Sequence, residues 1–246
     1  MKSPSPTAPS KATEDEILHL LRRAARLQRM ARAFAYPGPG HVREVVEALA
    51  TGGDDPLLGP VLAAWRAADE EAVRAEYVRL FLGTVPCPPN ETAWTPSKGL
   101  TGGAAELADL QGFYHAFGFE PAGSSREMPD HVSVELEFLG VLLVKLAYAR
   151  IQEWEDPAEV TGEALHAFLE AHTGRWVSAF VSRLRDLGVA SPYLETAQAL
   201  EAAVEAECQA VGARPVRATG LPVLSDPVPF QCPHGPDPGR QEVGKG

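Results

Sequence analysis

The sequence is poor in cysteine and in basic side chains, and it has no long apolar run. Its three cysteines, Cys87, Cys208 and Cys232, are widely spaced and form no Cys-x-x-Cys pair. They therefore indicate neither a disulfide framework nor a zinc cluster, and a reducing cytoplasm is the expected location. No stretch approaches the roughly 18 apolar residues of a membrane helix, so we expect no stable membrane insertion. Residues 1–12 lack the apolar core of a secretory signal.

Basic residues are outnumbered by acidic ones, 22 Lys and Arg against 33 Asp and Glu, and the formal net charge is −11. Nucleic-acid-binding proteins normally present a basic surface, so the composition argues against a nucleic-acid partner. An acidic chain of this kind suits solubility or a partner with basic groups.

No segment shows the sustained two-residue alternation of a β-strand, whereas apolar residues recur at helical spacing through most of the chain. We predict an all-α, single globular domain of about eight to ten helices over residues 13–212. A proline-containing turn leads into its broadest apolar helix, which begins near residue 130 and should pack on several sides. Residues 1–12 should be disordered, residues 119–129 form a link that could serve as a hinge, and residues 213–246 form a proline-rich irregular tail. Predicted helices cover about 14–35, 41–50, 56–67, 70–82, 102–117, 130–146, 157–187 with a break near His172, and 192–212.

Asp130 and His131 lie where the proline-containing turn enters the broad apolar helix. Asp130 has the chemistry of a helix N-cap, accepting from amides one turn ahead. His131 lies one turn before Glu135, so these two side chains could pair on one helix face or lie on the surface. A metal site is weakly supported, because Glu127 and His131 lack the Glu-x-x-His spacing of metal-binding bundles.

A loop at residues 84–94 is stiffened by Pro86, Pro88 and Pro89, because each proline fixes its own φ angle. A stiff loop that carries Asn90, Glu91 and Trp94 would present a fixed surface, and its alternative role is to cover the preceding helix. Residues 91–137 contain eight acidic side chains and only two basic ones. This acidic stretch could attract an arginine-bearing peptide or could simply form a solvated surface.

Other chemical motifs are weak. Cys232 and His234 offer too few ligands for a metal site, and no glycine-rich phosphate loop, Gly-x-Ser-x-Gly elbow or His-Glu-x-x-His motif occurs. Cys87 is expected to be a buried or partly buried thiol. We therefore predict no catalytic residue, no metal and no cofactor, and consider a metal- or nucleotide-dependent enzyme a minor alternative.

Two motifs resemble those of the TorD/DmsD/NarJ family of maturation chaperones for molybdenum-containing enzymes. Residues 77–83, Tyr-Val-Arg-Leu-Phe-Leu-Gly, precede Pro88 and Pro89, and residues 129–131, Pro-Asp-His, precede Glu-Leu-Glu-Phe-Leu at 135–139. The order of the two motifs and their separation of about 40 residues also match. Residues 87–92 and 108–118 resemble the branch that serves periplasmic nitrate, chlorate, selenate, dimethylsulfide or ethylbenzene enzymes.

The resemblance implies an all-helical cytoplasmic chaperone that binds the twin-arginine signal peptide of an apo catalytic subunit until its cofactor is inserted. The peptide would lie in a groove between helices 72–82 and 130–146, with Glu91 or Asp130 meeting its arginines. A permanent accessory subunit of the reductase complex is the main alternative, and either a monomer or a dimer is compatible with the sequence. The predicted peptide-binding residues are Tyr77, Leu80, Phe81, Pro88, Pro89, Asn90, Glu91, Trp94, Asp130, His131 and Glu135.

Overall fold

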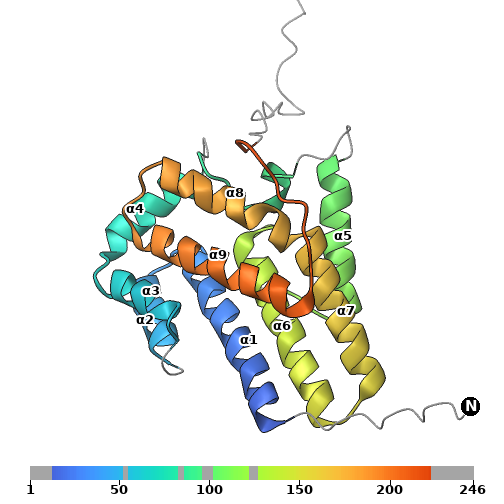
Figure 1. The fold of residues 1–246 in the computed structure, drawn as a ribbon. Helices are drawn as coiled ribbons and strands as arrows, with labels where there is room; N and C mark the ends of the chain where they lie inside the picture. The colour runs from blue at the N-terminus through green and yellow to red at the C-terminus, as the bar shows by residue number, and fades with distance from the viewer. Residues whose placement is uncertain (1–12, 52–54, 83–85, 96–101, 122–126, 223–246) are drawn as a thin grey trace, which may run out of the picture.

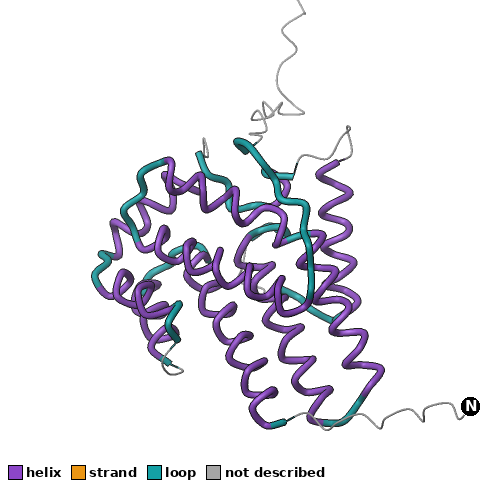
Figure 2. The backbone as a smooth tube through the Cα atoms, in the orientation of Figure 1, coloured by secondary structure: helices purple, strands orange, loops and turns teal. Residues whose placement is uncertain are grey.

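The computed structural model describes residues 13–51, 55–82, 86–95, 102–121 and 127–222 (Figure 1). Within these ranges the chain forms nine α-helices and one short 3-10 helix, and Figure 2 shows only helices and loops there. The predicted all-α class and helix number are confirmed. The helices are α1 (Glu14–Phe34), α2 (His41–Ala50), α3 (Leu58–Arg66), α4 (Glu70–Phe81), α5 (Gly102–Ala116), α6 (Val132–Ile151), α7 (Glu155–Ala171), α8 (Thr173–Asp186) and α9 (Pro192–Val211), with the 3-10 helix η1 (Glu91–Ala93) between α4 and α5.

Local sequence signals account for several helix ends. Thr13 and Glu16 form a reciprocal capping box at the start of α1, and Asp69 accepts from the amides of Glu71 and Ala72 at the start of α4. Gly212 has a φ of 73°, the left-handed conformation in which glycine commonly ends a helix. The predicted break near His172 is present, since α7 ends at Ala171 and α8 begins at Thr173.

Helix α6 lies at the centre of the molecule, packed along α1 on one side and α7 on the other (Figure 1). Its buried side chains point in all directions around the helix rather than along one stripe. The broad apolar pattern predicted this arrangement. The buried apolar residues of α6 are Val132, Val134, Leu136, Phe138, Leu139, Gly140, Leu142, Leu143, Leu146, Ala147 and Ala149.

A second part of the core joins α4, α8 and α9 to the end of α1. In it, Tyr77 and Phe81 of α4 pack edge to face against Tyr193 of α9, at 6.0 and 5.3 Å between ring centroids. Phe34 and Phe180 complete this cluster from α1 and α8. The inward face of α4 is therefore committed to the core.

Residues 213–222 form no helix and run back across the start of α8, where the amide of Ala218 donates to the carbonyl of Arg175 at 2.7 Å. The predicted disordered segment 1–12, the middle of the predicted hinge and the tail beyond residue 222, with Cys232 and His234, lie outside the described residues.

Candidate functional site

The loop at residues 86–95 and the turn before α6 are joined by backbone pairing. The amide of Glu91 donates to the carbonyl of Asp130 at 2.9 Å, and the amide of Val132 donates to the carbonyl of Pro89 at 2.8 Å. Asn90 and His131 thereby form an isolated antiparallel bridge. Two motifs about 40 residues apart in the sequence therefore form one structural unit, which we call the loop–turn unit (residues 86–95 and 127–135).

Asp130 holds the loop through its carboxylate, which is buried. Oδ2 accepts from the hydroxyl of Thr92 at 2.7 Å and from its amide at 3.2 Å, and Oδ1 accepts from the side-chain amide of Asn90 at 3.0 Å. The prediction that Asp130 caps α6 is wrong. Its carboxylate turns toward the loop, where the amide and hydroxyl of Thr92 donate to it, and His131 takes the capping position of α6.

His131 is the actual N-cap of α6. Its Nδ1 accepts from the amide of Ser133 at 3.2 Å and lies 2.7 Å from the Ser133 hydroxyl. Because Nδ1 is an acceptor, Nε2 carries the hydrogen, and it lies 3.5 Å from both the Tyr77 hydroxyl and a Glu127 oxygen. Burial lowers the pKa of His131 to about 3, so the ring is neutral at physiological pH.

Glu127 connects the turn to two other elements. One oxygen accepts from the amide of Tyr36, in the link between α1 and α2, at 3.2 Å, and the Tyr77 hydroxyl of α4 hydrogen-bonds the same carboxyl group. Burial raises the pKa of Glu127, and the hydrogen bonds from Tyr36 and Tyr77 oppose that shift. Glu127 therefore ties the turn to α4 and the α1–α2 link through polar contacts.

A second polar cluster lies on the other side of the loop–turn unit. Glu91 accepts from His172 Nδ1 at 3.0 Å, and Glu135 accepts from the Thr173 hydroxyl at 2.7 Å and from Trp176 Nε1 at 3.2 Å. All five side chains are buried. The sequence did not predict this cluster, and its three members on the His172–Trp176 segment were missed. The predicted side-chain pairing of His131 with Glu135 is wrong, because Glu135 is turned toward α8.

Burial raises the pKa of Glu135 well above its usual value, and the nearby Glu91 carboxylate adds to the shift. Burial also raises the pKa of Glu91, against the stabilising hydrogen bond from His172. Burial and the charge of the neighbouring Glu91 both favour the protonated form of Glu135. One oxygen of each carboxyl group has no hydrogen-bond partner within the described ranges.

Arg175 lies at the edge of this cluster. Its guanidinium is 3.9 Å from Glu91 and 3.8 Å from Glu106 of α5. On the other side of the His172 ring, Nε2 lies 3.3 Å from the exposed carboxylate of Asp109, but the two groups are not aligned for a hydrogen bond. The cluster thus links the loop to α5, α6 and α8 through charged and polar groups.

Comparison with known protein families identifies the family of this chain. The model of the family described as "Nitrate reductase delta subunit" matches residues 42–182, more than half of the chain. The chain belongs to the nitrate reductase delta subunit family.

Two curated relatives are also similar over most of their length. The chlorate reductase assembly chaperone protein of Ideonella dechloratans is 30% identical over 192 residues, which cover 77% of this chain and 89% of the relative. The selenate reductase assembly chaperone protein of Thauera selenatis is 31% identical over 186 residues, which cover 74% of this chain and 86% of the relative. A crystal structure of a putative redox enzyme maturation protein from Archaeoglobus fulgidus matches with a TM-score of 0.48 and 19% identity, covering 82% of this chain and 99% of that one.

In this family member, the predicted peptide-binding residues mostly face the interior. Ten of the eleven are buried, and Asn90 alone among them is partly exposed. In this conformation a peptide cannot reach the buried side chains, and their part in peptide contact stays a prediction. The ten buried residues are Tyr77, Leu80, Phe81, Pro88, Pro89, Glu91, Trp94, Asp130, His131 and Glu135.

The expectation that Glu91 and Trp94 present a fixed surface is wrong. Trp94 donates through Nε1 to the carbonyl of Pro88 at 2.8 Å and packs against Phe180. Glu91 and Asp130 are both buried and hydrogen-bonded inside the protein. In this conformation neither is exposed to make the predicted contact with an arginine. Cys87 is a buried thiol as predicted, and burial raises its pKa.

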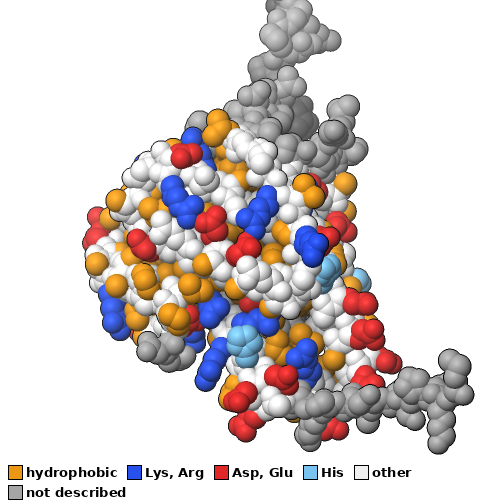
Figure 3. All heavy atoms as spheres, in the orientation of Figure 1, with side chains coloured by type: hydrophobic (Ala, Val, Ile, Leu, Met, Phe, Trp, Pro, Cys, Tyr) orange, Lys and Arg blue, Asp and Glu red, His pale blue; other side chains and the backbone are white. Residues whose placement is uncertain are grey.

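The acidic stretch at residues 91–137 is likewise not one solvated surface. Glu91, Asp130 and Glu135 account for three of its carboxylates and lie in the interior. On the face shown in Figure 3, acidic side chains gather over α7 instead. Exposed carboxylates there include Glu155, Asp156, Glu159 and Glu163.

None of the helices in the described ranges combines the length and apolar character needed to cross a bilayer. Within the same ranges, no group of three or more His, Cys, Asp or Glu side chains is arranged to hold a metal ion.

Proposed function

We propose that this chain is an assembly chaperone for a molybdenum-containing reductase and that it acts in the cytoplasm on the apo catalytic subunit. It binds the subunit through its twin-arginine signal peptide and assists cofactor insertion before export. The observation that carries the proposal is the pair of curated relatives, both assembly chaperones, each similar over at least 86% of its own length.

The geometry supports a binding role without chemistry. The two family motifs meet in the loop–turn unit, and its polar side chains are used for internal hydrogen bonds. His131 is neutral and Cys87 has a raised pKa, so neither is poised as a general acid or a thiolate nucleophile at neutral pH. Such a unit fixes the relative positions of α4, α5, α6 and α8, whose outer surfaces are then available to a partner.

The proposal is tested by capturing the tagged chain from the cytoplasm of its own cell and identifying what accompanies it by mass spectrometry. We expect a reductase catalytic subunit that still carries its twin-arginine leader and lacks its cofactor. Recovery of no reductase subunit, in repeated captures under conditions that induce the enzyme, would contradict the proposal.

A permanent accessory subunit is a second candidate, favoured by the "delta subunit" description of the matching family. The same capture distinguishes the two. A permanent subunit would be recovered in fixed ratio with mature, cofactor-loaded enzyme, whereas a chaperone would be recovered with the leader-bearing precursor and be absent from the mature complex.

A further inference from the structure

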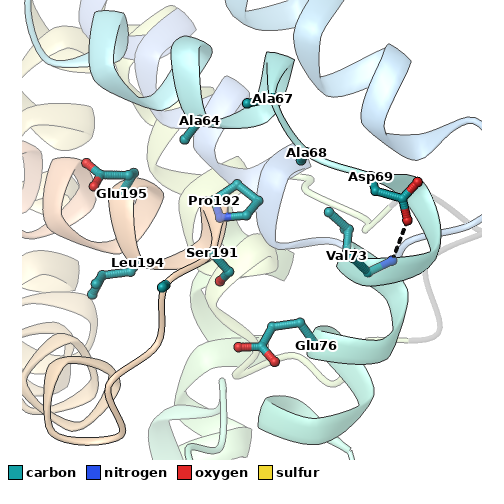
Figure 4. A pocket seen from close by; sticks show the side chains of 12 residues that line it. Ala64, Ala67, Ala68, Asp69, Val73, Glu76, Ser191, Pro192, Leu194 and Glu195 are labelled. Atoms are coloured by element: carbon teal, nitrogen blue, oxygen red, sulfur yellow. Dashed lines mark hydrogen bonds between the residues drawn. The ribbon is translucent and has the colours of Figure 1, made fainter.

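A surface pocket of about 730 Å³ lies between the α3–α4 turn and the start of α9 (Figure 4). Its volume is within the range of pockets that bind small molecules and peptide side chains. Most of its lining is apolar and small, contributed by Ala64, Ala67, Ala68, Ala72, Val73, Ala190, Pro192 and Leu194. Small side chains allow the backbone of a bound segment to approach closely.

The polar lining of this α4/α9 pocket is acidic. Asp69, Glu76 and Glu195 contribute carboxylates, and no lysine or arginine is among the described lining residues. Figure 4 shows Pro192 near the middle of the view, with the three carboxylates on different sides of it. Glu195 forms no ion pair with another described residue, whereas Glu76 is paired with Arg79 at 2.7 Å and Asp69 caps α4. The pocket therefore complements a segment that combines apolar groups with positive charge.

The pocket shares its walls with the family motif. Val73 and Glu76 precede Tyr77 on α4, and Pro192 and Leu194 flank Tyr193 on α9. The rings of Tyr77 and Tyr193 contact each other in the core. The motif residues thus fix the spacing of the two helices from inside, while the outward-facing residues of the same helices line the pocket.

We propose that the α4/α9 pocket is a docking site for a short arginine-bearing apolar segment of the client, with Glu195 as the main guanidinium contact. The inference rests on the proposed function and assigns a surface to it. The apolar groups of the segment pack on the alanine-rich lining, and a guanidinium forms charge-assisted hydrogen bonds with the carboxylates.

The test uses the full chain and a fluorescent model peptide with two adjacent arginines followed by apolar residues. Binding is measured by anisotropy for the wild type and for Ala72→Trp, which fills the pocket from an exposed position, and Glu195→Lys, which reverses the unpaired charge. Ala206→Trp on the exposed side of α9 and Glu159→Lys on α7 are matched controls. Circular dichroism confirms folding, and Glu195→Gln provides a milder variant in case Glu195→Lys fails to fold.

We expect Ala72→Trp to weaken peptide binding at least about tenfold and Glu195→Lys about threefold to tenfold, with the effect of Glu195→Lys shrinking as salt increases. The controls should bind like the wild type, and a peptide with both arginines replaced by glutamine should bind weakly to all. Equal binding by folded pocket variants and controls would overturn the pocket assignment. Failure of the wild type to bind the peptide, while the cellular capture still recovers a precursor, would overturn the pocket assignment and the proposed binding through the signal peptide. It would leave the assembly-chaperone function itself standing. If neither binding nor capture occurs, both proposals fail.

Discussion

Single residues in the loop–turn unit are positioned by hydrogen bonds that cross between distant parts of the sequence. Asp130 accepts three hydrogen bonds from Asn90 and Thr92, and removing its carboxylate takes the acceptor away from these partly buried donors. Hydrogen bonds to charged groups contribute more than neutral ones, and an unsatisfied buried donor is costly.

We therefore predict that Asp130→Ala lowers the free energy of unfolding by at least about 2 kcal/mol, measured by urea denaturation followed by circular dichroism. Glu163→Ala, which removes an exposed carboxylate from α7, should change stability by no more than about 0.5 kcal/mol. If Asp130→Ala proved as stable as the wild type while losing client binding, Asp130 would be a contact residue rather than the anchor of the loop.

Glu135 gives the second residue-scale prediction, on pH dependence. Its pKa in the folded state is raised well above the unfolded value of 4.5, so the folded chain keeps a proton that the unfolded chain releases. Stability therefore falls as pH rises through the interval above 4.5, because the unfolded state binds fewer protons there.

Glu135→Gln removes this titration while keeping an acceptor for Thr173 and Trp176. We predict that the stability of the variant relative to the wild type increases between about pH 5 and pH 8, measured by urea denaturation across that range. Glu159→Gln on the surface of α7 serves as control. A constant difference between Glu135→Gln and the wild type across this range would show that Glu135 is already ionised in the folded chain.

At the scale of elements, the close packing of α7, α8 and the segment after α9 depends on Gly174. A Cβ at this position would lie 2.3 Å from the carbonyl oxygen of Leu169 and 2.9 Å from the ring of Pro215. The backbone carbonyl belongs to α7 and cannot move away easily, so any side chain here forces the helix junction apart.

We predict that Gly174→Ala destabilises the fold by more than about 2 kcal/mol and that thermal denaturation shows a correspondingly lower Tm. Gly162→Ala is the matched comparison, since its Cβ would meet nothing within 4 Å. It should stabilise helix α7 by about 0.5–1 kcal/mol. Similar effects of the two substitutions would contradict the packing described here.

The elements themselves could be predicted from the sequence, because their signals are local. Apolar periodicity and the break near His172 placed the helices and gave most of their boundaries within a few residues, although α6 continues to Ile151 rather than ending near residue 146. The direction of the loop side chains could not be predicted in this way. Glu91 turns inward because His172 and Arg175, some 80 residues later, supply partners that no local pattern reveals.

The same limit explains the error at Asp130. A local view assigns it to the start of its own helix, whereas the donors that it accepts from lie about 40 residues earlier in the chain. Its burial was equally hidden, since an acidic residue in a charged stretch is usually solvated. The sequence therefore indicated which residues belong together, but not that most of them are buried; their part in peptide contact stays a prediction.

At the scale of the whole molecule, the helices form a scaffold whose centre is apolar and whose polar interior groups connect α4, α5, α6 and α8. The chain belongs to the nitrate reductase delta subunit family, and its curated relatives are assembly chaperones. We infer that the family motifs hold this scaffold in shape, and that client contact falls to outer surfaces such as the α4/α9 pocket.

The most direct test of assembly function is the molybdenum content of the captured reductase subunit, produced in one host with and without this chain. The account predicts similar amounts of subunit in both cases, but much less molybdenum per subunit and little activity when the chain is absent. Restoring the wild-type chain should restore both. Full molybdenum loading without the chain would contradict the assembly function proposed here.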